Sequence, residues 1–118
     1  MSQFRHFDVR HFDGFTELHL ADTTFFDVSR YAELQDELLT FVETQRPRHL
    51  VVNFDRIRYG STALINGLLQ CRNRLTAIGG ELKLYGMCDP VREAFFMLNL
   101  DGNVFGIYES ESDALVAF

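Results

Sequence analysis

Hydrophobic positions along the chain follow the patterns of strands in some segments and of helices in others. Phe4 to Val9 and Phe15 to Leu20 read as a pair of strands, and between them Asp13-Gly14 is a pair that favours a tight hairpin turn. Leu50 to Phe54 is a short, continuous apolar run, which is typical of a strand covered on both faces. These segments predict an N-terminal hairpin and a central strand.

A helix is expected after the polar segment from Asp22 to Asp27, which reads as a loop. Ser29 is a suitable capping residue for this helix, and Pro47 marks the point before which it ends. Its apolar residues recur with the helical period, at Tyr31, Leu34, Leu38, Phe41 and Val42.

The strongest periodic signal comes after the stretch RYGSTALING, which runs from Arg58 to Gly67. Apolar side chains recur there at helical steps, at Leu64, Leu68, Cys71, Leu75 and Ile78. Gly79-Gly80 is a pair that can close this helix through a left-handed cap. We expect the stripe to face the core, with Leu68 at its centre.

Strands and helices continue to alternate in the remainder of the chain. Glu81 to Met87 and Val104 to Tyr108 read as strands, Asp89-Pro90 as a cap followed by the first helical residue, and Ser110-x-x-Asp113 as a capping box. The sequence therefore predicts a single α/β domain over residues 1–118, with a mixed, mostly parallel central sheet, an N-terminal hairpin and about four helices.

Composition and charge limit the classes of function that this protein can have. The net charge of −6, with no stripe of basic residues, argues against nucleic acid as the ligand. The longest apolar runs are far too short to cross a bilayer and no signal peptide is recognisable, so we expect no membrane insertion and a cytoplasmic location. Cys71 and Cys88 are then expected to be free thiols.

The chain offers no clear constellation for catalysis or for a cofactor. The four histidines show no spacing typical of metal ligands. A carboxylate pair, a nucleophile with its base, and a glycine-rich phosphate loop are all missing from the sequence pattern. We therefore expect neither an enzyme nor a bound cofactor or metal.

Across its whole length the chain resembles the anti-sigma-factor antagonist family, the STAS domain. The resemblance rests on the order and spacing of several pieces, namely Leu50-Val51-Val52-Asn53-Phe54, Asp55 to Gly60, the helix opening at Ser61, Gly79-Gly80-Glu81-Leu82-Lys83-Leu84, Pro90-Val91, Leu98-Asn99-Leu100-Asp101, Phe105-x-Ile107, and Ser110 with Ala114-Leu115. It implies a STAS-like fold and a bacterial signalling role. The implied partner is an anti-sigma factor or serine/threonine kinase, joined in some pathways by a phosphatase.

The resemblance also assigns roles at the helix opening. In the family this helix typically begins Asp-Ser-Ser-Gly-Leu or Asp-Ser-Thr-Gly-Leu, and the first hydroxyl is phosphorylated by a kinase that is also an anti-sigma factor. Aligned without gaps, Ser61 stands at the aspartate position, Thr62 at the phosphoacceptor and Ala63 at the second hydroxyl. Thr62 is thus the candidate phosphoacceptor, with Ser61 second. The other interpretation is that both hydroxyls simply begin a helix.

Residues around this junction are candidates for partner binding, namely Arg56, Arg58, Tyr59, Gly60, Ser61, Thr62, Ile65 and Leu69. The two arginines either pair with a phosphate or only solvate the loop. Ile65 and Leu69 lie off the predicted inward stripe, and Phe96, Met97 and Leu100 make the next helix more apolar than one buried face requires. This surplus indicates either a protein contact or a large core.

The sequence thus favours an antagonist-like STAS protein in a partner-switching pathway, with Thr62 as the switch. Two alternatives stay open, because STAS domains also serve transport systems. One is an accessory subunit of a lipid or small-molecule transport system, and the other is a scaffold module that is not phosphorylated.

Overall fold

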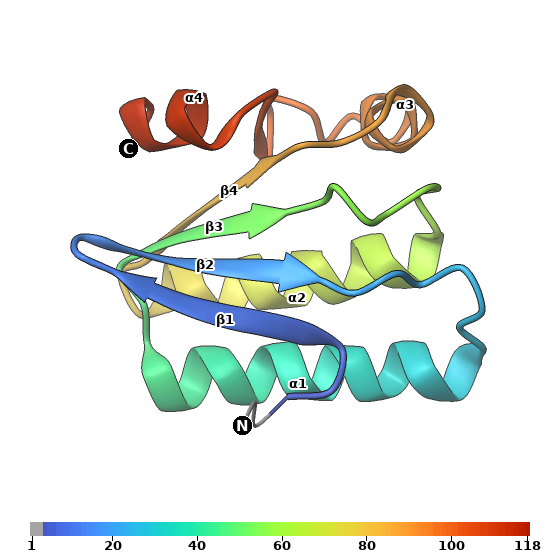
Figure 1. The fold of residues 1–118 in the computed structure, drawn as a ribbon, viewed down its shortest axis with the longest axis horizontal. Coiled ribbons are helices and arrows are strands. Elements are labelled where there is room, and N and C mark those ends of the chain that lie inside the picture. The colour runs from blue at the N-terminus through green and yellow to red at the C-terminus, as the bar shows by residue number, and fades with distance from the viewer. Residues whose placement is uncertain (1–3) are drawn as a thin grey trace.

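A mixed sheet forms the centre of the computed structural model, which describes residues 4–118 (Figure 1). Strand β1 (Phe7–Phe12) pairs antiparallel with β2 (Phe15–Leu20) across the Asp13-Gly14 turn. Strands β3 (His49–Asn53), β4 (Glu81–Tyr85) and β5 (Gly106–Tyr108) follow in parallel, and the strand order is β1-β2-β3-β4-β5. The predicted α/β fold is confirmed, and β3 is the central strand.

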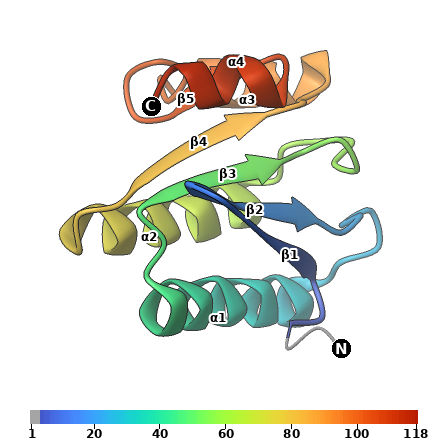
Figure 2. The ribbon, with the colours of Figure 1, turned by 60° about the vertical axis from the view of Figure 1, so that its left-hand side comes forward.

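The described helices lie on the two sides of this sheet. Figures 1 and 2 show α1 (Val28–Gln45) and α2 (Thr62–Ala77) side by side on one side, and α4 (Glu111–Val116) lies on the other. Helix α3 (Asp89–Met97) buries Val91 and Phe95 in the same core cluster as α2, where Phe95 contacts Phe54. Helix α4 packs against β3, β4 and β5. Because β3 is covered from both sides, each of its residues from Leu50 to Asn53 is buried, as its apolar run predicts.

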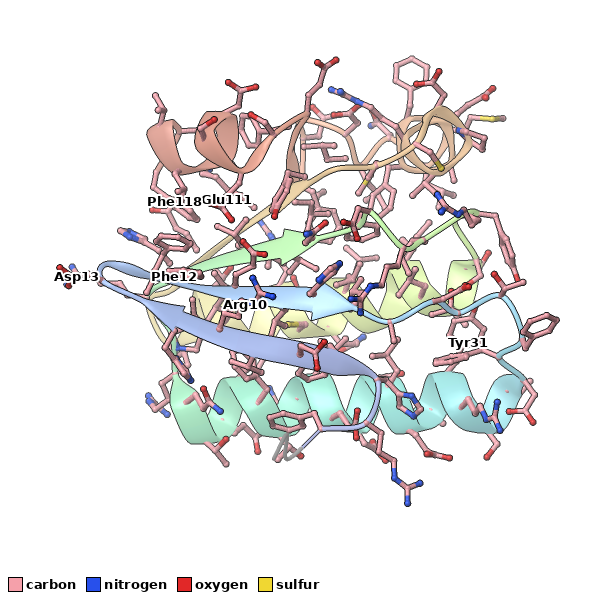
Figure 3. The ribbon with its side chains drawn as sticks, in the orientation of Figure 1. Arg10, Phe12, Asp13, Tyr31, Glu111 and Phe118 are labelled. Carbon is pink, nitrogen blue, oxygen red and sulfur yellow. The ribbon has the colours of Figure 1, made fainter. Side chains whose placement is uncertain are left out.

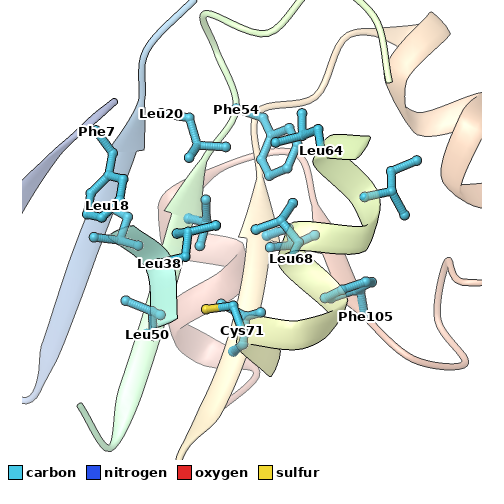
Figure 4. Packing of buried hydrophobic residues seen from close by; sticks show 14 of the residues in the cluster. Phe7, Leu18, Leu20, Leu38, Leu50, Phe54, Leu64, Leu68, Cys71 and Phe105 are labelled. Atoms are coloured by element: carbon cyan, nitrogen blue, oxygen red, sulfur yellow. The ribbon is translucent and has the colours of Figure 1, made fainter. Parts of the chain in front are cut away.

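The core lies between the sheet and the helix pair (Figure 4). Alternate strand residues point into it and meet the inner faces of α1 and α2; fully buried members include Leu18, Leu20, Leu50, Val52, Leu38, Phe41, Leu68 and Leu75. Burial of each large side chain contributes about 1.5–3 kcal/mol relative to exposure. The predicted core stripe of α2 is confirmed at Leu64, Leu68, Cys71 and Leu75, while Ile78 is half-buried.

The ends of two helices differ from the prediction. Helix α1 is capped by Asp27, whose carboxylate accepts the Arg30 backbone N–H at 2.9 Å, so the expected cap Ser29 lies inside the first turn. Helix α3 is preceded by Cys88, and Asp89, expected as its cap, is the first helical residue. A carboxylate in the first turn is favourable there because it faces the positive end of the helix dipole.

Three strands differ from their patterns. Strand β1 is shifted from Phe4–Val9 to Phe7–Phe12, and β4 and β5 are shorter, with β4 ending at Tyr85 before Gly86, which has φ 80°. The backbone N–H groups of Arg5 and His6 donate to the Glu37 carboxylate of α1 at 2.9 and 3.0 Å, so regular pairing begins only at Phe7. Strand β5 is confined to Gly106–Tyr108 because the preceding residues form a turn, in which Gly102 donates to the Phe105 carbonyl at 2.8 Å. Side-chain competition and turns are not visible in hydrophobic periodicity.

Other local predictions are confirmed. Helix α2 ends at Ala77, and beyond it Gly79 has φ 87° while the Gly80 N–H donates to the Leu75 carbonyl at 3.0 Å, which is the expected glycine cap. Ser110 caps α4 by accepting the Asp113 N–H at 3.2 Å. Cys71 and Cys88 are free thiols, and burial raises the pKa of Cys71 to about 12.

Candidate functional site

Two loops meet at the carboxyl end of the parallel strands, where α/β sheets commonly place their binding sites. Figure 1 shows the loop that follows β3 and the loop that follows β2 reaching the same end of the molecule. They are joined by Tyr59, whose hydroxyl donates to the Thr24 carbonyl at 3.1 Å. We call residues 24–28 together with residues 58–62 the carboxyl-end surface.

Ser61 is the N-cap of α2. Its side chain accepts the Leu64 backbone N–H at 3.1 Å, and its carbonyl accepts the Ile65 N–H at 3.1 Å. The extended backbone of Ser61, with φ −73° and ψ 148°, is the conformation that capping residues adopt. Its hydroxyl is therefore occupied by the fold.

Thr62 is the first residue of α2 and is exposed. The cap is already supplied by Ser61, so the Thr62 hydroxyl is not needed to begin the helix. Helix N-termini favour anions, because first-turn N–H groups and the dipole both point at the ligand. The two adjacent hydroxyls thus have different environments, because Ser61 is half-buried with its oxygen in the cap and Thr62 is exposed.

The loop before Ser61 lies tightly against α3. A Cβ placed on Gly60 would lie 2.8 Å from the Ala94 Cβ, a distance that real side chains do not tolerate. Cys88, which precedes α3, also contacts this loop, because its Sγ lies 3.6 Å from the carbonyl oxygens of Ile57 and Arg58. Gly60 is therefore required for close packing, and Tyr59, which is 45% exposed, is the aromatic residue of the loop that projects outward.

Both arginines of the loop have carboxylate neighbours. The Arg56 Nη1 lies 3.7 Å from the Asp8 Oδ2, and both side chains are largely exposed. Hydrogen bonds from Thr24 hold the pKa of Asp22 below its usual value, and the charge of Arg58 adds to this effect. Such exposed pairs are weak, so both guanidinium groups remain available to a stronger anion.

Ile65 does not lie where its position in the pattern suggests. Its side chain is only 2% exposed and belongs to the core, so the expectation that it faces outward is wrong. Leu69 and Leu100 are half-buried against the core, whereas Phe96 and Met97 are exposed. Helix α2 buries a wide face because it contacts both α1 and the sheet, and even Gly67 is buried beside Leu38.

Sequence reasoning missed two apolar residues of the carboxyl-end surface. Phe25 and Val28 are each 88% exposed, although the segment from Asp22 to Asp27 reads as a polar loop. Phe26 is turned inward, against His6 and Tyr31, which leaves Phe25 outside. The Phe25-Phe26 pair inside a polar segment was the available signal.

A shallow groove continues from this surface between α1 and α2. Its volume is about 280 Å³ and it is lined by Val28, Tyr31, Ala32, Gln35, Ala63 and Asn66. Ala63 directly follows Thr62, so the groove opens beside the candidate phosphoacceptor. The exposed Phe25, Val28 and Tyr59 with this groove form a surface suited to a protein contact.

A second polar cluster lies on the other face of the sheet. Burial raises the pKa of Glu17 to about 7, and the nearby Glu111 carboxylate of α4 adds to the rise. Figure 3 shows Glu111 on the α4 side of the sheet and Arg10 on the hairpin. His19 and Asp55 share a hydrogen bond on the same face. Within residues 4–118, no group of three or more His, Cys, Asp or Glu side chains is placed to hold a metal ion.

Comparison with known proteins identifies solved structures that have a similar fold. The chain has a TM-score of 0.78 with an anti-sigma factor antagonist from Mycobacterium paratuberculosis, at 19% identity over 94% of this chain and 91% of that one. The phosphorylated form of the Bacillus cell fate determinant SpoIIAA gives a TM-score of 0.66 at 16% identity, covering 94% and 97%. A sulfate transporter family protein from Wolinella succinogenes gives 0.67 at 16% identity, covering 86% and 81%.

These likenesses are of fold, since all three identities are low. No curated protein sequence matches the chain significantly. The family model of the STAS domain, however, matches residues 6–114, which is nearly the whole chain. The strand order, the N-terminal hairpin and the helix that begins after β3 agree with that match. On this basis, the chain belongs to the STAS domain family.

Proposed function

We propose that this protein is an anti-sigma-factor antagonist-like STAS protein that binds a regulatory protein partner, a kinase-type anti-sigma factor, through the carboxyl-end surface. The observation that carries the proposal is the position of Thr62, exposed at the start of α2 beside a hydroxyl that is already used as the cap. The protein acts by binding and not by catalysis.

The contact is made by the apolar side chains around Thr62. Tyr59 and Phe25 project from two loops that the Tyr59–Thr24 hydrogen bond holds together, and Val28 adds an exposed side chain at the start of α1. Aromatic side chains of this kind are enriched in protein interfaces because they bury a large area at small entropic cost. Arg56 and Arg58 add polar contacts at the rim.

Phosphorylation of Thr62 is the proposed switch. A phosphate adds about −1.5 to −2 charges, and the N-terminus of α2 accommodates them without loss of the fold. The same charge inside an apolar contact repels a partner, because it would have to be desolvated there. Release thus needs no unfolding. Ser61 in place of the family aspartate leaves the first turn of α2 without an acidic residue, so the kinase has to recognise a neutral helix start.

The second candidate function is an accessory role in a transport system, which the likeness to the Wolinella succinogenes protein favours. In residues 4–118, no helix combines the length and the apolar character that a bilayer span requires. Such a subunit would have to act on a separate membrane component. The third candidate is a scaffold module in which Thr62 is never modified.

Affinity capture from the native host separates these candidates. Wild-type protein, Thr62→Ala and Thr62→Glu serve as baits, and the bound proteins are identified by mass spectrometry. We expect a kinase-type or sigma-regulating protein on wild type and on Thr62→Ala, and its loss on Thr62→Glu. The captured kinase should phosphorylate wild type but not Thr62→Ala, and mass mapping should place the phosphate on residue 62.

Other results would contradict the proposal in distinct ways. Transporter components bound equally by all three baits would support the accessory role instead. Capture of a sigma regulator without any phosphate on residue 62 would support the proposed partner and would contradict phosphorylation of Thr62 as the switch.

A further inference from the structure

The free edge of the sheet is strand β1, which pairs only with β2. Within residues 4–118 no strand continues the sheet beyond it, and Figures 1 and 2 show β1 at the outer border. Asp8, Arg10, His11 and Phe12 are exposed. An edge strand offers a row of unpaired backbone groups to any second strand.

The register with β2 shows which residues carry these groups. Ala21 donates to the His6 carbonyl at 2.9 Å, so the pair of residues 6 and 21 is of the hydrogen-bonded kind. Hydrogen-bonded and non-hydrogen-bonded pairs alternate in antiparallel strands. Asp8 and Arg10 therefore point their backbone groups at β2, and Phe7, Val9 and His11 point theirs away from it. Phe7 is only 2% exposed, so the accessible outward groups are those of Val9 and His11.

We propose that β1 pairs antiparallel with β1 of a second copy of this chain, with Val9 opposite Val9. This register joins the outward-facing backbone groups of the two Val9 residues, and it makes one sheet across a two-fold axis. It goes beyond the partner-binding function, because it uses neither Thr62 nor the loops around it.

Charge complementarity favours a second copy of this chain as the partner of β1, and it also favours this register. With Val9 at the axis, Asp8 of each copy stands opposite Arg10 of the other, in a non-hydrogen-bonded pair where side chains approach most closely. A shift by two residues in one direction opposes Asp8 to Asp8, and in the other direction Arg10 to Arg10. Both shifts set like charges against each other.

The charges on this edge differ from those that prevent association. A row of one sign would repel a second copy, whereas Asp8 and Arg10 alternate in sign on the same face. Asp8 keeps 62% of its side chain exposed beside Arg56, at 3.7 Å, so the contact within one copy leaves it accessible. The edge is thus self-complementary.

The test is sedimentation of the full chain at micromolar to millimolar concentration. We expect a concentration-dependent dimer for wild type, a dissociation constant raised about tenfold or more by Arg10→Asp or Asp8→Arg, and recovery in the Asp8→Arg/Arg10→Asp double variant, where tenfold corresponds to 1.4 kcal/mol. Val9→Pro should be monomeric and folded, because its lost N–H points outward and proline is tolerated at such positions.

Amide exchange provides a matched control within one sample. The amide of Val9 should become protected as concentration rises, while those of Asp8 and Arg10 should stay unchanged. A wild type that remains monomeric at millimolar concentration would overturn the proposal. So would a Val9→Pro variant that dimerises as wild type does, or a double variant no tighter than the single ones.

Discussion

Ser61 and Thr62 are adjacent hydroxyls with separate physical tasks. Ser61 satisfies the Leu64 N–H, one of the backbone groups that have no partner within a helix. Thr62 has no part in the cap and is exposed. Ser61 therefore stabilises the start of α2, and a change of charge at Thr62 would leave this cap intact.

Ser61→Ala is expected to lower the free energy of unfolding by about 1 kcal/mol, because the Leu64 N–H loses its acceptor. Chemical denaturation measures this change. Thr62→Ala is the matched control and should be near wild type. Equal stability of Ser61→Ala and wild type would show that the cap is replaced by water at no cost.

Glu17 makes stability depend on pH. Its pKa in the folded protein, about 7, lies above the value of 4.5 for a free glutamate, chiefly because the side chain is 5% exposed. The folded state therefore holds a proton that the unfolded state releases between these values, and stability falls as pH rises from 4.5 to 7. Above pH 7 the loss is complete.

Glu17→Gln should remove this loss. We expect the variant to match wild type near pH 4.5 and to be more stable above pH 7, by up to about 3 kcal/mol on the scale of 1.36 kcal/mol per pKa unit. Denaturation midpoints across this range test it, with the difference between the two proteins as the readout. A difference that does not change with pH would contradict the shifted pKa.

At the scale of elements, helix α2 connects the core to the candidate site. Its buried face runs along the sheet and α1, and its first turn carries Ser61 and Thr62 to the surface. The position of Thr62 is thus fixed by packing several residues away. Damage to that packing would therefore displace Thr62 without changing any residue of the candidate site.

Leu68→Asp should unfold the domain, because it places an unpaired carboxylate at a fully buried position of α2. Gln70→Asp introduces the same charge on the exposed face of the same helix and should remain folded. Circular dichroism with thermal melting distinguishes the two. A Leu68→Asp protein that melts as wild type does would refute the assignment of the core.

Periodicity predicted the type and order of every helix and strand, because burial of one face is what forms the pattern. Periodicity was less able to predict the exact residues at which each helix and strand begins and ends. Asp27 and Ser29 are both good caps, and only the hydrogen bond to Arg30 separates them. The outward assignment of Ile65 failed for a related reason, since a stripe drawn on one helix does not include the neighbours that cover its flank.

At the scale of the whole molecule, the fold brings together residues that the sequence keeps apart. Thr24 and Tyr59 come from different loops, and their hydrogen bond places Phe25 and Val28 near the start of α2. The family resemblance predicted the Thr62 side of this surface. It could not predict the Phe25 side, because that segment contributes through its place in the fold and not through a motif.

The fold is retained where sequence identity is low, as the TM-score of 0.78 at 19% identity shows. What such relatives share is the alternation of buried strands and amphipathic helices, which many sequences satisfy. The free β1 edge and the carboxyl-end surface carry individual side chains instead. We propose that the properties particular to this protein depend on these two surfaces.

The most direct test of the account is the affinity of the captured partner for wild type and for three variants at residue 62. Thr62→Glu should weaken binding by about tenfold or more, a loss of 1.4 kcal/mol, while Thr62→Ala and the neutral, similarly sized Thr62→Gln should bind nearly as wild type. All should share its unfolding midpoint to within about 1 kcal/mol. Binding of Thr62→Glu equal to wild type, or an equal loss with Thr62→Gln, would contradict a charge switch at Thr62.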